Sequence, residues 1–244
     1  MSEQRDLEGL SALVTGATSG IGRAAAEQLA RHGAEVIVHG RDAARGQAVT
    51  DAIAAGGGKA RFVAADLTDP VALDDLAQHA AGVDVLVNNA GYSWFGPTPE
   101  LDGATFGRLF AANVQAPYFL TAAAAPKMAD RGSGSIINIG SMAGEVGMPG
   151  GAAYGATKAA LDSMTRSWAA EYSKAGVRIN TIASGPVYTA IQPAEVTGAV
   201  GATTIMGRAA QPDEIANLIV FLASPKASYI TGAVISADGG RAAI

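Results

Sequence analysis

Residues 15–22 read Thr-Gly-Ala-Thr-Ser-Gly-Ile-Gly (TGATSGIG) and follow directly on the apolar run 10–14. An Ala-rich stretch comes next, so the order is strand, glycine turn and helix N-terminus. Glycine allows a ligand to approach the main chain closely, and the free N–H groups of a helix N-terminus attract a pyrophosphate. The T-G-x-x-x-G-x-G spacing differs from the common G-x-G-x-x-G fingerprint, and a bare turn between a strand and a helix has similar residues. The turn therefore indicates a dinucleotide site that needs support from the rest of the chain.

The alternation of short β-branched runs and longer Ala-rich stretches continues along the chain and is typical of βα units on a parallel sheet. The predicted strands are 10–14, 35–38, 60–64, 83–87, 135–139, 178–182 and 233–236. The predicted helices are 21–31, 43–54, 70–80, 103–128, 152–174 and 212–223. No linker, composition shift or internal repeat divides the chain. We therefore predict one α/β domain over residues 1–244, a Rossmann-type doubly wound parallel sheet with helices on both faces.

Residues 185–207 form the least regular region, which is rich in Gly, Ala, Thr and Pro and follows a predicted strand. In open α/β sheets, ligands bind beyond the carboxyl ends of the strands. We therefore predict that this region is a mobile lid over a ligand.

Composition narrows the possible activities. The net charge is -5 without any basic run, which argues against a nucleic-acid partner. The chain has no cysteine and three scattered histidines, so we expect no metal site and catalysis by oxygen and amine groups. Residues 1–9 lack the apolar core of a secretory signal, and no apolar stretch approaches the roughly 20 residues that span a bilayer. We expect a cytoplasmic protein with no membrane partner.

Three further motifs follow the later predicted strands. They are Asn88-Asn89-Ala90-Gly91, then Ser141, then Tyr154-Gly155-Ala156-Thr157-Lys158. Together with residues 15–22, they resemble in kind and order the motifs of the short-chain dehydrogenase/reductase family, and the likeness covers nearly the whole chain. The resemblance implies about seven strands in the order 3-2-1-4-5-6-7 and hydride transfer between a nicotinamide and an alcohol or ketone. It also implies a homotetramer built through helices 103–128 and 152–174, although the sequence leaves a dimer open.

Tyr154 and Lys158 are four residues apart and share one face of the predicted helix. An adjacent ammonium lowers the pKa of a phenol from its usual value of about 10, which would make Tyr154 a usable proton donor. Ser141 can donate a hydrogen bond to the substrate oxygen as negative charge develops there. The resemblance adds that Lys158 holds the nicotinamide ribose and that Asn113 completes a water-linked proton relay. An Asn in a long helix can equally be a satisfied core residue.

The end of the second predicted strand, Val38-His39-Gly40-Arg41, indicates which nicotinamide nucleotide binds. NAD-dependent enzymes usually place a carboxylate near this point, whereas an Arg accommodates the 2′-phosphate of NADP. Gly40 stands where the acid is common and Arg41 follows, with His39 as a possible second contact. We therefore predict NADP(H) as the cofactor. The alternative is that Arg41 is only an exposed loop residue.

The remaining cofactor contacts follow from the glycine turn and from the resemblance. They are Gly16, Thr18, Ser19, Gly20, Ile21, Gly22, Asp66, Leu67, Asn89, Ala90, Gly91, Tyr154, Lys158, Val187 and Thr189. One position departs from the family's pattern, because Ser184 stands where family members usually have proline. Serine lacks the fixed φ of proline and adds an N–H donor, so we expect a more flexible segment there.

The predicted substrate side is mostly apolar and favours a hydrophobic or aryl-bearing ketone, although Glu145 can bind a polar substituent. Its residues are Trp94, Phe95, Gly144, Glu145, Met148, Tyr188, Ile191 and Met206. Trp94 and Phe95 can equally be loop or subunit contacts.

Two alternative functions stay open. A 3-oxoacyl-acyl-carrier-protein reductase would resemble this chain but carry Arg residues on its docking surface, where Ser135 and Ala175 stand at two of those places. Other basic residues are close in the sequence, namely Lys127, Arg131, Arg166 and Lys174. A non-catalytic NADP-sensing protein would need no Ser141, Tyr154 and Lys158 together.

Overall fold

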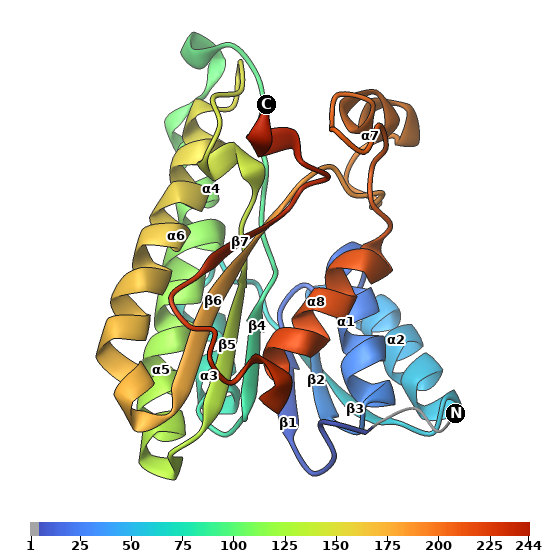
Figure 1. Ribbon diagram of the computed structural model, residues 1–244, viewed down its shortest axis with the longest axis vertical. Coiled ribbons are helices and arrows are strands. Elements are labelled where there is room, and N and C mark those ends of the chain that lie inside the picture. The colour runs from blue at the N-terminus through green and yellow to red at the C-terminus, as the bar shows by residue number, and fades with distance from the viewer. Residues whose placement is uncertain (1–4) are drawn as a thin grey trace.

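Seven parallel strands form the centre of the structure, a computed structural model that describes residues 5–244 (Figure 1). They are β1 (Ser11–Val14), β2 (Glu35–Gly40), β3 (Lys59–Ala64), β4 (Val85–Asn88), β5 (Gly134–Ile139), β6 (Val177–Ser184) and β7 (Val234–Ala237). Their order in the sheet is β3-β2-β1-β4-β5-β6-β7, which confirms the predicted topology. The order reverses between β1 and β4, and ligands of such sheets bind at the carboxyl ends beside this point.

Helices cover both faces of the sheet (Figure 1). On one face lie α1 (Gly20–Arg31), α2 (Ala43–Ala55) and α8 (Pro212–Ala223). On the other lie α3 (Pro70–Ala80), α4 (Gly103–Phe110), α5 (Ala116–Arg131) and α6 (Ala152–Tyr172). The remaining one of the eight α-helices in residues 5–244, α7 (Ala194–Gly201), stands apart at the carboxyl edge of the sheet. Short 3-10 turns are η1 (Thr98–Glu100), η3 (Met142–Gly144), η4 (Ser173–Ala175), η5 (Pro225–Ala227) and η6 (Arg241–Ala243).

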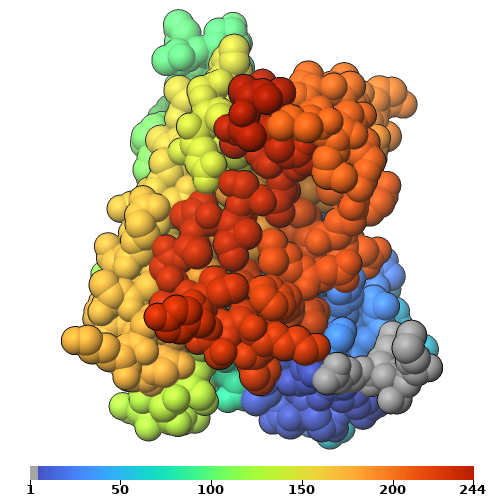
Figure 2. Space-filling view, in the orientation of Figure 1, coloured from blue at the N-terminus to red at the C-terminus, as the bar shows by residue number. Residues whose placement is uncertain are grey.

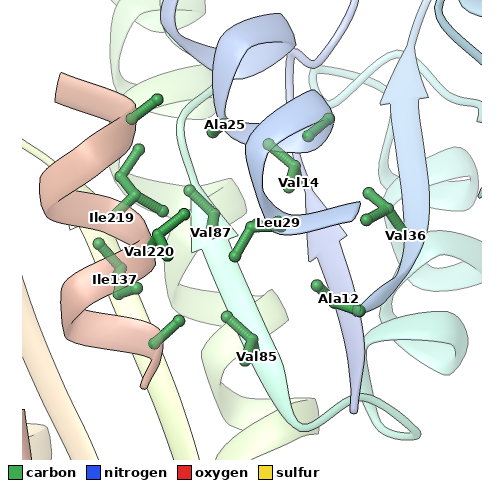
Figure 3. Close-up of a cluster of buried hydrophobic side chains, with 14 of the residues drawn as sticks. Ala12, Val14, Ala25, Leu29, Val36, Val85, Val87, Ile137, Ile219 and Val220 are labelled. Carbon is green, nitrogen blue, oxygen red and sulfur yellow. The ribbon is translucent and has the colours of Figure 1, made fainter. Parts of the chain in front are cut away.

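Two apolar clusters attach the helix layers to the sheet. In the cluster of Figure 3, Ile219 and Val220 of α8 and Leu29 of α1 point toward Val85 and Val87 of β4. Fully burying a side chain of this size stabilises the fold by about 1.5–3 kcal/mol. These contacts fix the positions of the strands. They therefore also fix where the loops at the carboxyl ends of the strands begin.

The starts of α2, α3 and α4 follow from their capping residues. Asp42, Asp69 and Asp102 each accept a main-chain N–H in the first turn of α2, α3 and α4. Such a cap stabilises a helix by about 1 kcal/mol. The predicted start of α3 at Asp69-Pro70 is therefore confirmed.

The structure differs from the prediction in three places. The helix predicted over 103–128 is interrupted by a π-helical turn, η2 (Ala111–Gln115), which separates α4 from α5. Strands β2 and β6 continue two residues beyond their predicted ends, to Gly40 and Ser184. The irregular region 185–207 contains the helix α7, which begins after Pro193. No helix in residues 5–244 is long and apolar enough to cross a membrane.

Candidate active site

A cavity of about 920 Å³ opens at the carboxyl ends of the strands. Its lining comes from the glycine turn after β1, the ends of β2 to β6, and α6. Cavities of 300–1,000 Å³ are typical of small-molecule and cofactor sites. Its position at the reversal between β1 and β4 is the one expected for a nucleotide in this fold.

Most of the predicted cofactor contacts line this cavity. They are Gly16, Thr18, Ser19, Gly20, Ile21, His39, Arg41, Asp66, Leu67, Asn89, Ala90, Gly91, Tyr154, Lys158 and Thr189. Gly22 and Val187 do not line it. A Cβ on Gly22 would lie 2.4 Å from the Gly16 carbonyl oxygen, so Gly22 is needed beneath the turn. Val187 forms a bridge to Ala210 and packs against the core.

The glycine turn is attached to the Asn89 loop by a compact set of hydrogen bonds. The Thr15 hydroxyl oxygen accepts the N–H groups of Asn89 and Ala90 at 2.9 and 3.0 Å. The Asn89 side-chain amide donates to the Thr15 carbonyl at 2.8 Å. Gly16 has φ +64°, and a Cβ there would lie 2.9 Å from the Ala90 Cα. Only glycine fits at position 16, because both the conformation and the close approach exclude a side chain.

Two arginines stand at the β2 end of the cavity. Arg41 and Arg45 are exposed and both line it, while Asp42 between them caps α2 by accepting the Arg45 N–H at 3.0 Å. Position 40 is glycine and so carries no carboxylate. A Cβ at that position would lie 2.5 Å from the Thr18 Cγ2 atom. Sequence reasoning missed Arg45, although its position one helical turn after Arg41 was a usable signal.

His39 lies behind this end of the cavity. It is 2% exposed, and its ring nitrogens lie 3.2 Å from the Gly16 amide nitrogen and 3.2 Å from the Ala65 carbonyl oxygen. Burial lowers the pKa of His39 to about 4, so the ring is neutral. Both nitrogens are engaged within the protein, which leaves neither for a phosphate. This geometry therefore does not support the predicted contact between the His39 side chain and the cofactor.

The opposite end of the cavity holds a group of three polar side chains, those of Tyr154, Lys158 and Ser141. Tyr154 and Lys158 line the cavity. Ser141 lies two residues after the end of β5, at the start of η3, and forms a hydrogen bond with the Tyr154 phenol. The Lys158 ammonium donates to the Ile139 carbonyl at 2.8 Å and lies 5.7 Å from the centre of the Tyr154 ring. The Phe95 ring packs against Tyr154 with centroids 5.4 Å apart. The strand end and the helix thus bring two hydroxyl groups and one amine to one place.

Burial acts on both titratable groups of this trio. It raises the pKa of Tyr154, and the hydrogen bond to Ser141 offsets part of that rise. It lowers the pKa of Lys158 to about 8, against the effect of Asp162. The pKa of Tyr154 is therefore raised in this structure and not lowered as expected, because burial outweighs the hydrogen bond from Ser141. The phenol is fully protonated at neutral pH and can serve as an acid.

Asn113 lies in the π turn η2, directly behind the cavity wall. Its Oδ1 accepts the Tyr92 N–H at 2.8 Å, while its amide donates to the Tyr92 carbonyl at 2.8 Å and to the Thr157 hydroxyl at 3.0 Å. A Cβ on Gly91 would be 3.2 Å from Asn113 Oδ1 and 3.7 Å from Lys158 Nζ. Asn113 is thus near Lys158, with its hydrogen-bonding groups used by the Tyr92 loop and α6.

Only part of the predicted substrate side lines the cavity. Phe95 and Ile191 do so, whereas Trp94, Gly144, Glu145, Met148, Tyr188 and Met206 do not. The Trp94 ring lies over Gly96. Tyr188 faces a separate hollow of about 450 Å³ between the start of α1 and α7. Met206 is 61% exposed and donates its N–H to the Gly239 carbonyl.

Several lining residues were not predicted from the sequence. They include Arg45, Tyr92, Ser93, Arg108, Ala112 and Gln192. Arg108 and Gln192 belong to segments far apart in the chain, α4 and the loop after β6. No local pattern marks either residue, because only the folded arrangement brings them to the same cavity.

The chain belongs to the short-chain dehydrogenase/reductase family of oxidoreductases. A family model described as "Enoyl-(Acyl carrier protein) reductase" matches residues 16–242. A cis-4-hydroxycyclohexanecarboxylate dehydrogenase from Sinomonas cyclohexanicum is 38% identical, and the match covers 96% of both chains. The family resemblance of the sequence motifs is therefore confirmed.

Two solved structures are similar over nearly the whole chain. One, described as a candidate β-ketoacyl-ACP reductase, is 48% identical with a TM-score of 0.90 and covers 98% of this chain and 100% of that one. The other is described as a candidate NAD(P)-dependent gluconate 5-dehydrogenase from Beutenbergia cavernae with NADP bound at low occupancy. It is 39% identical with a TM-score of 0.93, over 98% of this chain and 99% of that one. The three relatives differ in substrate, so the likeness defines the reaction class and not the substrate.

Proposed function

We propose that this protein is an NADP(H)-dependent carbonyl reductase, which reduces a ketone to an alcohol and catalyses the reverse oxidation. The observation that carries the proposal is the shape of one continuous cavity. The glycine turn and two arginines line one end, Tyr154 and Lys158 line the other, and Ser141 is hydrogen-bonded to the Tyr154 phenol.

The residues of the first end fit NADP(H). The main chain of residues 16–21 can accommodate the pyrophosphate at the start of α1. Arg41 and Arg45 would hold the 2′-phosphate, and the absence of a carboxylate at Gly40 removes the group that would repel it. Similar structures bound to NADP support the same cofactor.

Bound NADPH supplies the hydride that the ketone carbon receives. The Ser141 hydroxyl hydrogen bonds to the carbonyl oxygen and stabilises the negative charge that develops there. Tyr154 donates its phenolic proton to this oxygen. The Lys158 ammonium, one helical turn away and 5.7 Å from the ring centre, stabilises the phenolate that is left. We assign Asn113 to holding the Tyr92 loop against Thr157, the residue before Lys158 on α6, where a water-linked path can return the proton.

The substrate that best suits the wall is a hydrophobic or aryl-bearing ketone. Phe95, Tyr92 and Ile191 are apolar or aromatic and line the cavity, and the Phe95 ring packs against Tyr154. Arg108 and Gln192 also line the cavity, so an acidic or polar substituent on the ring can find a partner. Aryl ketones with and without a carboxylate are therefore the first compounds to compare.

A 3-oxoacyl-acyl-carrier-protein reductase is the second candidate, favoured by the 48% identity to a structure of that description. Ser135 is 2% exposed and donates to the Leu222 carbonyl, so this position does not belong to a docking surface. A CoA-linked 3-oxo ester in the same assay separates this candidate from the first.

The remaining proposals concern assembly and the lid. We propose a homotetramer, with a dimer as the alternative, because large aromatic side chains are exposed on α4 and α5. We also propose that residues 185–207 move as a lid, since Thr189, Ile191 and Gln192 line the cavity from this segment. Figure 2 shows this segment beside the C-terminal residues on one face of the molecule.

The test is a panel of ketones read by NADPH absorbance, with Tyr154→Phe as the variant. We expect wild-type turnover of at least one ketone and a loss of about 1,000-fold or more in kcat for the variant, within the range of acid catalysis and the charge stabilisation lost with it. NADPH binding, measured by fluorescence, should stay within about threefold. NADPH binding without turnover across the panel would instead indicate a cofactor-sensing protein, and an active variant would refute the role of Tyr154.

A further inference from the structure

His39 is a buried imidazole that the proposed reaction does not use. It lies in β2 next to the nucleotide end of the cavity, and its ring joins two loops that come from different strands. The Gly16 N–H donates to Nδ1 at 3.2 Å, in the turn after β1. Nε2 lies 3.2 Å from the carbonyl oxygen of Ala65, the residue after β3. The ring thus spans the two walls between which the nucleotide end of the cavity opens.

The hydrogen bonds determine the tautomer of this ring. A main-chain N–H is only a donor, so Nδ1 must be the unprotonated acceptor, and Nε2 must carry the proton toward the Ala65 carbonyl. A protonated imidazole has two donors and cannot accept from Gly16. Burial keeps the pKa of His39 near 4 despite the neighbouring Asp66 carboxylate, and the other charged groups on this side of the cavity are Arg41 and Arg45.

The main chain of the same residue strengthens the link. The Ala17 N–H donates to the His39 carbonyl at 2.8 Å, so His39 holds two successive amides of the glycine turn. Gly16 has φ +64°, a conformation that local sequence does not enforce because glycine is free to leave it. An acceptor fixed by β2 is therefore what keeps the Gly16 amide turned inward.

We propose that His39 is a positioning residue for the nucleotide site, which as the neutral Nε2–H tautomer holds the Gly16 turn and the Ala65 loop at the separation that NADPH requires. This inference rests on the proposed function and extends it to a residue that touches no phosphate. It predicts that the acceptor at Nδ1 matters more for NADPH than the donor at Nε2, because only the first holds the glycine turn.

Two substitutions separate the two nitrogens. His39→Asn places an amide oxygen near the position of Nδ1 and can keep the acceptor for Gly16, whereas His39→Gln places an amide nitrogen near Nε2 and keeps only the donor for Ala65. We expect the Kd for NADPH to rise on the order of threefold for the Asn variant and tenfold or more for Gln, as for one lost hydrogen bond. KM for NADPH should rise more than kcat falls. His79→Gln, on the outer helix α3, is the matched control.

The wild-type protein provides an independent measurement. Nitrogen-15 NMR of the histidine rings, assigned by the loss of signals in His39→Asn, should show one ring in the Nε2–H form that does not titrate between pH 8 and about 5. Titration of His39 near its ordinary pKa, the opposite tautomer, or equal Kd values in the Asn and Gln variants would overturn the proposal. If wild type did not bind NADPH, the proposed cofactor would be refuted. The NMR spectra would still show which tautomer the His39 ring adopts and whether it titrates.

Discussion

At the scale of single residues, burial is the main cause of the pKa shifts in and beside the site. Tyr154 and Lys158 are both shifted toward their uncharged forms, and the same is true of Asp162, one turn beyond Lys158 on α6. Asp162 is 4% exposed, and its Oδ1 has no hydrogen-bond partner among residues 5–244. Burial is the main reason that the pKa of Asp162 rises from 3.8 to about 6, with Glu145 adding to the rise.

A raised carboxyl pKa makes stability depend on pH in a defined direction. The stabilising contribution of protonated Asp162 is complete below pH 3.8 and is lost as the pH rises through about 6. We therefore expect Asp162→Asn to increase the free energy of unfolding by about 1–3 kcal/mol at pH 7 and to leave it nearly unchanged at pH 4. Urea unfolding at the two pH values measures this. The exposed Asp74→Asn is the control, and an equal effect at both pH values would contradict the assignment.

We expect the residue at position 40 to affect how the site discriminates between NADPH and NADH. Wild type should have a kcat/KM for NADPH that exceeds that for NADH, and a ratio below one would contradict the NADP(H) assignment. Gly40→Asp should lower this ratio tenfold or more, on the order of the loss of one charge-assisted contact. Its Cβ would meet Thr18 at 2.5 Å, so the effect should be clearest when combined with Thr18→Ser. Thr18→Ser alone is the control.

At the scale of elements, the π turn η2 is the least ordinary part of the fold. It inserts a wider turn between α4 and α5 at Asn113, and π turns inside helices are frequent at functional sites. Asn113→Ala would leave the Tyr92 N–H and carbonyl without their partner. We expect a loss of about 2–4 kcal/mol in the free energy of unfolding together with a lower kcat.

Gln115 provides the comparison for that variant, since it lies in the same turn but is exposed. Gln115→Ala should change stability by no more than about 0.5 kcal/mol. If Asn113→Ala also cost less than about 1 kcal/mol, the two hydrogen bonds between Asn113 and Tyr92 would not be holding the Tyr92 loop.

The elements also show what sequence can and cannot predict. The strands followed from β-branched runs and the start of α3 followed from its cap Asp69, since both signals are local. The π turn was not predictable because its stretch has ordinary helix periodicity, and α7 was hidden by a composition typical of loops. The glycine turn and the Tyr154 trio were found through their spacing. The roles of His39 and Arg108 depend on contacts between distant segments, which no local pattern records.

At the scale of the whole molecule, exposed aromatic side chains on two helices bear on how the chains assemble. Phe106, Tyr118 and Phe119 are 44–48% exposed on α4 and α5, an unusual concentration of aromatic surface. We expect sedimentation to give a mass near four times 24.4 kDa for a tetramer, or near twice 24.4 kDa for a dimer. Tyr118→Glu combined with Phe119→Glu should reduce the assembly, while Tyr229→Glu, at a fully exposed site elsewhere, should not. A wild-type mass of 24.4 kDa would refute the proposal.

The exposure of Met206 has a practical use. Its side chain is 61% exposed on the proposed lid, and the 244 residues contain no cysteine. Met206→Cys would therefore introduce the single thiol of this sequence, to which a nitroxide or a fluorophore can be attached without further substitutions. Such a probe would report how far the segment travels when nucleotide or ketone is added, and on what timescale.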